Sequence, residues 1–120
     1  MCSDLTDSIY LHFHHIPQTQ EEIQTWWINR TIEEKKIFNG MMSHMRQRHK
    51  NVTVTEEDLY KMILKQGNRC IRTGIPFEWK RHSPRLLSVD RINPKSPDGY
   101  SLSNIQLVVY SFNRLKNEWA

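Results

Sequence analysis

Hydrophobic and polar residues follow one another along the first half of this chain at the spacing of amphipathic helices. Ile37, Met41 and Met45 recur at steps of four and so fall on one face of a helix. Further along, Leu59, Met62 and Ile63 share one helix face in the same way. The pattern therefore predicts that the chain before residue 67 is mostly helical.

Three threonines mark where these helices begin. Thr19 and Thr31 are each followed three residues later by a glutamate, which is the signature of a capping box. Thr55 precedes the acidic run 56–58 and is expected to cap a third helix. Gly67 offers a C-terminal cap for that third helix, because glycine accepts a left-handed backbone.

Residues that interrupt helices and strands become frequent after residue 70. Prolines and glycines interrupt the chain repeatedly up to residue 100, which leaves two short β-type runs at 86–89 and 105–109. We expect these runs to form a β-hairpin with a long connection. A last helix is expected from about Tyr110 to Asn117.

The length of 120 residues allows one domain with one modest core. We divide the chain into an N-terminal arm over residues 1–18, a helical region over 19–66 and a C-terminal unit over 67–120, all packed as a single compact domain. The predicted fold class is α+β, with a mostly helical N-terminal half followed by the hairpin and its helix.

Positive charge is concentrated in the later part of the chain. Residues 1–40 hold three Lys and Arg against six Asp and Glu, whereas residues 41–120 hold fourteen against seven. Such asymmetry favours a polyanionic partner, since each neutralised phosphate releases condensed counterions. A solvated basic surface without a partner is the alternative interpretation.

Compartment and membrane association follow from what the sequence lacks. No apolar run approaches the ~18 residues that cross a bilayer, so no membrane partner is expected. The two cysteines are too few for a disulfide framework or a four-cysteine zinc site. We therefore expect a cytoplasmic protein, in the host-cell cytoplasm if its source is viral, with Cys70 as a small buried residue and no structural zinc.

The most specific signal is a series of short motifs between residues 70 and 116. In chain order these are Cys70-Ile71-Arg72-Thr73-Gly74, Asp90-Arg91-Ile92, Gly99-Tyr100, Asn104 and Asn113-Arg114-Leu115-Lys116. Their order and spacing resemble the HNH, or ββα-metal, finger of endonucleases, in its phage-type variants. The resemblance covers residues 68–117.

This resemblance implies a metal-dependent hydrolysis of phosphodiester bonds in DNA, with RNA as the other substrate class. One divalent cation, Mg²⁺ or else Mn²⁺, would be held by Asp90 at the end of the first strand and by Asn113 on the last helix. Asn104 stands nine residues before Asn113, as the family pattern has it, and would pin the loop facing the catalytic strand. Such a protein acts as a monomer or a homodimer.

Position 91 departs from the family pattern. The best-known members carry there a histidine that takes a proton from water, whereas arginine stays protonated at neutral pH and serves only as a donor to phosphate oxygens. Tyr100 and the loop residue His82 remain as candidate bases, and a metal-bound hydroxide is a third source. The resemblance thus implies the metal ligands but leaves the proton acceptor open.

Further basic residues are candidate contacts to a nucleic-acid backbone. They are Arg46, Arg48, Lys50, Lys80, Arg81, Arg85, Arg114 and Lys116. By contrast, we expect the adjacent Trp26 and Trp27 to pack in the core rather than to stack on bases.

Two other classes of protein stay open beside the nuclease. A catalytically inactive HNH-like fold that only binds nucleic acid would explain the missing histidine. A zinc-binding interaction module is disfavoured by the shortage of cysteines. Metal-dependent nicking of plasmid DNA distinguishes the nuclease from the inactive nucleic-acid-binding protein.

Overall fold

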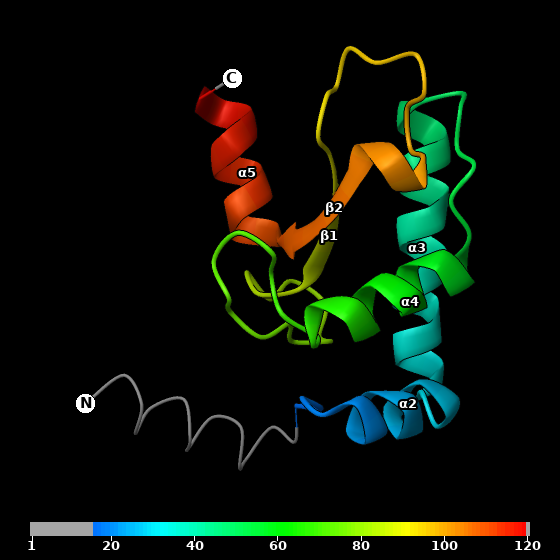
Figure 1. Cartoon of the computed structure of the whole chain (residues 1–120), viewed down its shortest axis with the longest axis vertical. Coiled ribbons are helices and arrows are strands. Elements are labelled where there is room, and N and C mark those ends of the chain that lie inside the picture. The colour runs from blue at the N-terminus through cyan, green and yellow to red at the C-terminus, as the bar shows by residue number, and fades with distance from the viewer. Residues whose placement is uncertain (1–15, 120) are drawn as a thin grey trace.

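The computed structural model describes residues 16–119 and shows an α+β fold (Figure 1). Three helices come first, followed by an antiparallel hairpin and a last helix. The elements are α2 (Gln20–Ile28), α3 (Ile32–Arg48), α4 (Glu56–Gln66), β1 (Leu87–Arg91), the 3₁₀ turn η1 (Leu102–Asn104), β2 (Ile105–Val109) and α5 (Tyr110–Trp119).

The three predicted helix starts are confirmed by their hydrogen bonds. Thr19, Thr31 and Thr55 each accept a bond from the backbone N–H three residues on, and each closes a complete capping box. At the other end of α4, Gly67 adopts a left-handed backbone with φ of 68°. These helices therefore begin where polar side chains satisfy the first free N–H groups.

The hairpin is antiparallel and runs in register from Leu87 opposite Val109 to Arg91 opposite Ile105. The predicted β-type run at 86–89 corresponds to β1, which extends to Arg91 and so includes Asp90, the residue expected at its end. Asp90 and Arg91 continue the ladder against β2. Both residues are therefore part of a strand.

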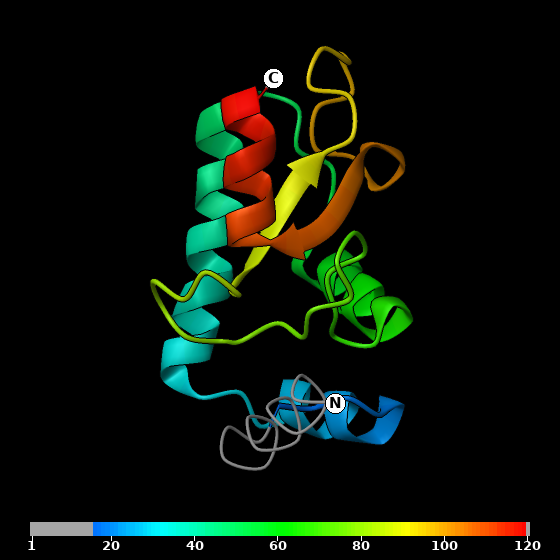
Figure 2. The ribbon, with the colours of Figure 1, turned by 90° about the vertical axis from the view of Figure 1, so that its left-hand side faces the viewer.

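The helices enclose the hairpin from two sides. Figure 2 shows the hairpin between α4 on one side and α3 with α5 on the other. One hydrophobic cluster unites these layers, with Phe38 from α3, Leu59 from α4 and Leu107 from β2 all fully buried. The predicted helical region 19–66 and the C-terminal unit thus share one core.

Aromatic rings extend this core toward α2. Trp26 and Trp27 pack against it, as expected, with the Trp27 ring 4.9 Å from that of Phe38. Phe38 in turn stacks on Trp79 at 4.9 Å. This cluster fixes the N-terminal end of α3 against the loop that precedes β1.

The structure describes only the end of the N-terminal arm predicted for residues 1–18. Residues 1–15 of that arm lie outside the described part, but Ile16 and Pro17 are buried. The side-chain amide of Asn68 donates to the carbonyl of Pro17 at 2.9 Å. Residues 16 and 17 therefore pack against the rest of the domain.

Within residues 16–119, no helix has both the length and the apolar character that crossing a membrane requires.

Candidate active site

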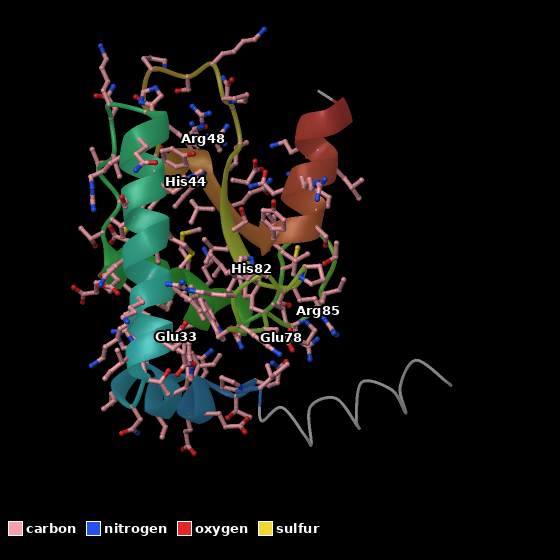
Figure 3. The ribbon with its side chains drawn as sticks, turned by 180° about the vertical axis from the view of Figure 1, so that it is seen from behind. Glu33, His44, Arg48, Glu78, His82 and Arg85 are labelled. Atoms are coloured by element: carbon pink, nitrogen blue, oxygen red, sulfur yellow. The ribbon has the colours of Figure 1, made fainter. Side chains whose placement is uncertain are left out.

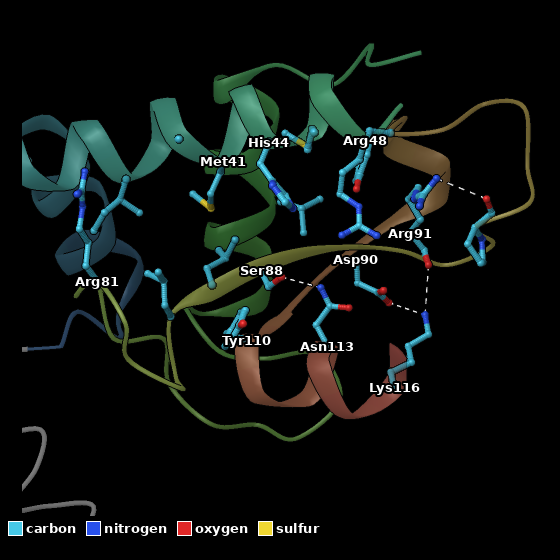
Figure 4. A pocket seen from close by; sticks show the side chains of 18 of the residues that line it. Met41, His44, Arg48, Arg81, Ser88, Asp90, Arg91, Tyr110, Asn113 and Lys116 are labelled. Atoms are coloured by element: carbon cyan, nitrogen blue, oxygen red, sulfur yellow. Dashed lines mark hydrogen bonds and ion pairs between the residues drawn. The ribbon is translucent and has the colours of Figure 1, made fainter. Parts of the chain in front are cut away.

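A cleft of about 420 Å³ opens between α3 and the unit formed by β1 and α5 (Figure 4). Strand β1 forms its floor, and the two helices form its walls. Ser88 and Asp90 stand on the same face of β1 because side chains alternate along a strand. Tyr110, Asn113 and Lys116 share a face of α5 because they are spaced by three residues.

Asp90 is the only carboxylate among the described residues that lines this cleft, and it is 6% exposed. Its Oδ2 accepts a hydrogen bond from Gln106 Nε2 at 2.7 Å and another from Lys116 Nζ at 2.7 Å. Gln106 reaches it because the two residues are directly paired in the hairpin. The Oδ1 atom has no hydrogen-bond partner among the side chains that the structure describes.

Asn113 lies on α5, the wall of the cleft next to the strand that carries Asp90. Its Nδ2 donates to the hydroxyl of Ser88 at 2.6 Å, which fixes the rotation of the amide. Figure 4 shows the amide oxygen of Asn113 on the side that faces Asp90. The cleft therefore directs a carboxylate and an amide oxygen toward the same space.

These donors fit a hard divalent cation. Magnesium is usually held in proteins by one or two carboxylates and keeps several of its waters. Among residues 16–119 no group of three or more His, Cys, Asp or Glu gathers as a closed metal cage. The oxygen atoms of Asp90 and Asn113 beside open space thus fit a Mg²⁺ ion, and the ammonium of Lys116 adds positive charge at Asp90.

Asn104 pins the loop that connects the two strands. Its side-chain amide donates to the carbonyls of Asn93 at 3.0 Å and Gly99 at 2.8 Å, and its Oδ1 accepts from the N–H of Asn93 at 3.0 Å. The backbone carbonyl of Asn104 also accepts from Ile92 at 2.7 Å. These bonds fix the loop directly beyond Asp90 and Arg91.

Arg91 and Tyr100 both line the cleft and contact each other. The Arg91 guanidinium lies 5.1 Å from the centre of the Tyr100 ring, and its Nη1 donates to the Pro94 carbonyl at 3.5 Å. Tyr100 is 3% exposed. Arg91 is thus placed to reach an anion in the cleft, whereas little of Tyr100 is open to it.

The backbone around Tyr100 is tied to the segment after α3. Tyr100 donates to the Asn51 carbonyl at 3.0 Å and accepts from Thr53 at 3.0 Å. Gly99 has φ of 59°, and a Cβ there would stand 2.4 Å from His49 Nδ1 and 2.5 Å from the Asn51 carbonyl. Glycine is required at this turn, both for its backbone and for the close approach.

The motif at Cys70 forms a tight turn behind β2 and lies outside the cleft. Cys70 accepts from Gly74 at 2.9 Å, and Ile71 donates to the Leu107 carbonyl at 3.1 Å. The Cys70 side chain is 2% exposed, as predicted. Burial by itself would raise the pKa of this thiol, but hydrogen bonds, first among them that of Thr73, outweigh burial and lower the pKa.

The structure does not bring His82 to the cleft. This residue is exposed in a turn closed by a bond from Ser83 to the Lys80 carbonyl, with a left-handed φ of 66°. Its neighbour Arg81 pairs with Glu33 at 3.4 Å, near the first turn of α3. Figure 3 shows His82 and Arg85 away from the end of α3 that carries His44 and Arg48.

The predicted nucleic-acid contacts fall into two groups. Arg48, Arg81 and Lys116 line the cleft. The other five are not among its lining residues; they are Arg46, Lys50, Lys80, Arg85 and Arg114. Helix geometry explains the difference on α3, since residues two apart point about 200° away from each other around the axis.

Sequence reasoning missed the contribution of α3 to this cleft. Lys36 and His44 line it together with Arg48, from positions four and eight residues apart. The sequence could have predicted that Lys36 and His44 lie on one side of the helix, because each directly precedes a residue of the apolar face that carries Ile37 and Met45. The periodicity of a helix does not show what the helix packs against. The position of this side of α3 opposite Asp90 therefore could not be predicted from the spacing of its residues.

No family model, no curated protein and no solved structure matches this chain.

Proposed function

We propose that this chain is a metal-dependent endonuclease of the HNH class that hydrolyses phosphodiester bonds in DNA. On this proposal, residues 67–120 form a ββα-metal finger. The observation that carries it is the meeting of Asp90 from β1 and Asn113 from α5 on one cleft, next to the loop that Asn104 pins. RNA is the alternative substrate of the same chemistry.

The cations around the cleft support a phosphate substrate. Arg48, Arg91 and Lys116 converge on it from three different elements. A backbone phosphate in the cleft would meet fixed positive charge on several sides, which stabilises the charge that builds up on its oxygens during attack. Arginine also matches two phosphate oxygens at once.

Asp90 and Asn113 would hold the metal in this mechanism. A bound Mg²⁺ or Mn²⁺ acts as a Lewis acid that neutralises developing charge on phosphate and leaving oxygens. Asp90 is suited to this role because Gln106 fixes its orientation from the paired strand. Ser88 fixes the amide of Asn113 in the same way.

The proposal is tested by incubating the intact chain with supercoiled plasmid. We expect conversion to the nicked or linear form with Mg²⁺ or Mn²⁺ and none with excess chelator. A labelled single-stranded RNA in a parallel reaction separates the two substrate classes. No conversion of DNA or RNA with either metal would contradict the proposal.

A second candidate is a nucleic-acid-binding protein on the same fold without catalysis. It is favoured by Arg91 at the expected position of the base and by the close pairing of Lys116 with Asp90, which already neutralises the carboxylate. This candidate predicts binding to a labelled duplex that falls with salt and never leads to cleavage.

A further inference from the structure

The proposed nuclease lacks an evident group to take a proton from the attacking water. Arg91 remains a cation at neutral pH and cannot do so. His82 stands outside the cleft, and Tyr100 is 3% exposed with its ring beneath the Arg91 guanidinium. Among the described residues, β1, α5 and their loop bring no histidine to the cleft and no carboxylate other than Asp90, so another element has to be considered for this role.

Helix α3 brings a histidine to the opposite wall. Lys36, Gly40, His44 and Arg48 are spaced by four residues and form a row along the cleft. His44 is exposed, so its ring is open to water and to a ligand. Figure 4 shows the His44 ring directed from α3 toward β1, between Met41 and Arg48 and across from Ser88 and Asp90.

We propose that His44 is the general base of the phosphodiester hydrolysis. The inference rests on the proposed function and deepens it. Neutral histidine is the side chain best matched to proton transfer near neutral pH, and a base within reach of the attacking water contributes ~10²- to 10⁴-fold to the rate.

The proposed reaction moves a proton from water to His44 and breaks one ester bond. An imidazole nitrogen of His44 accepts one proton from water, and the water oxygen forms a bond to phosphorus. The bond from phosphorus to one bridging ester oxygen breaks, and that oxygen takes up a proton from solvent. His44 then returns its proton to solvent, so that the net reaction consumes one water.

The charges that face His44 come from every wall of the cleft. Its own helix supplies Lys36 and Arg48, and the elements opposite supply Arg81, Arg91, Lys116 and the carboxylate of Asp90. The hydroxyls of Tyr100 and Tyr110 belong to the same lining. A substrate phosphate would therefore be drawn to the space that the ring of His44 borders.

The test compares single-turnover cleavage of a labelled duplex by the wild type, His44→Ala and His44→Gln. We expect both variants to lose at least 100-fold in rate at neutral pH, while duplex affinity in chelator changes by less than about threefold. The wild-type rate should rise through the acidic range, and His44→Ala should lose that rise. Added imidazole should restore part of the activity of His44→Ala in proportion to its concentration.

Two further variants serve as controls. Gln47→Ala alters an exposed residue of α3 that does not line the cleft and should cut at the wild-type rate. His82→Ala removes the histidine that stands outside the cleft and should do the same. Circular dichroism and thermal unfolding establish that each variant is folded.

The outcomes separate this inference from the proposed function. An active wild type together with an active His44→Ala of unchanged pH profile would overturn the role of His44 and leave the nuclease intact. Loss of cleavage and of duplex affinity together, without rescue by imidazole, would overturn it in favour of a binding role. An inactive wild type would overturn both.

Discussion

Asp90 is the residue on which the candidate site depends. It is held by an amide from the paired strand and by an ammonium from α5, both at 2.7 Å from Oδ2. The Asp90 side chain is 6% exposed and that of Lys116 is 32% exposed, so this pair is far better shielded than a surface ion pair. Lys116 therefore stabilises a charge that would otherwise be costly at this depth.

Replacing Lys116 by methionine tests whether the ammonium of Lys116 stabilises the buried carboxylate of Asp90. We expect the free energy of unfolding to fall by about 1–3 kcal/mol, because a mostly buried carboxylate loses its opposite charge. Mg²⁺ should then raise the Tm of Lys116→Met more than that of the wild type, since a bound cation replaces the missing ammonium. Thermal unfolding with and without Mg²⁺ measures both effects.

Lys61→Met is the matched control for this change. Lys61 pairs with Glu57 at 3.9 Å on the surface of α4, where the side chains are 68% and 76% exposed. Such a pair contributes little, about 0–1 kcal/mol. Equal Mg²⁺ effects on the two variants would contradict a cation site at Asp90.

At the scale of elements, the turn at Gly99 ties the hairpin loop to the end of α3. Gly99→Ala should destabilise the fold by more than about 2 kcal/mol, because the left-handed backbone is unfavourable for alanine and the added Cβ has no room beside His49 and Asn51. Chemical denaturation monitored by fluorescence measures the loss.

Gly74→Ala isolates the backbone part of this effect. Gly74 also has a positive φ, 74°, but a Cβ there would meet no atom within 4 Å. We expect this variant to lose only about 1–2 kcal/mol. If the two variants were equally destabilised, the close contact at Gly99 would not be significant.

Local elements were well predicted from the sequence because their signals are local. Threonine followed by an acidic residue at N3 placed the starts of α2, α3 and α4, and Gly67 placed the end of α4. The apolar run alone stopped at Val89, whereas β1 continues through Asp90 and Arg91, because pairing with β2 holds these polar residues in a strand conformation. Tertiary context outweighs propensity at such positions.

At the scale of the whole molecule, the cleft exists because α3 runs beside the hairpin (Figure 1) and contributes one wall opposite β1 and α5. The spacing of the motifs predicted Asp90, Asn104 and Asn113 as residues of the candidate site, since all three lie close together in the sequence. It gave no sign that His44 stands opposite them, because α3 and β1 are separated by about forty residues and meet only through the shared core.

The same arrangement predicts unequal roles for two arginines of α3. Arg48 lines the cleft and Arg46 does not. Arg48→Ala should therefore weaken duplex binding more than Arg46→Ala and should reduce the salt slope of the affinity by about one unit. Fluorescence anisotropy at a series of salt concentrations checks this, and a larger loss in Arg46→Ala would place the nucleic acid on another face.

The central claim is that the cleft of Asp90 and Asn113 hydrolyses phosphodiester bonds with a divalent metal. Its most direct test is the rate of plasmid nicking in Mg²⁺ by the wild type, Asp90→Asn and Asp98→Asn, the last being an exposed loop carboxylate outside the cleft. We predict that Asp98→Asn nicks like the wild type and that folded Asp90→Asn has lost at least 100-fold in rate. Nicking by Asp90→Asn at the wild-type rate would contradict the account.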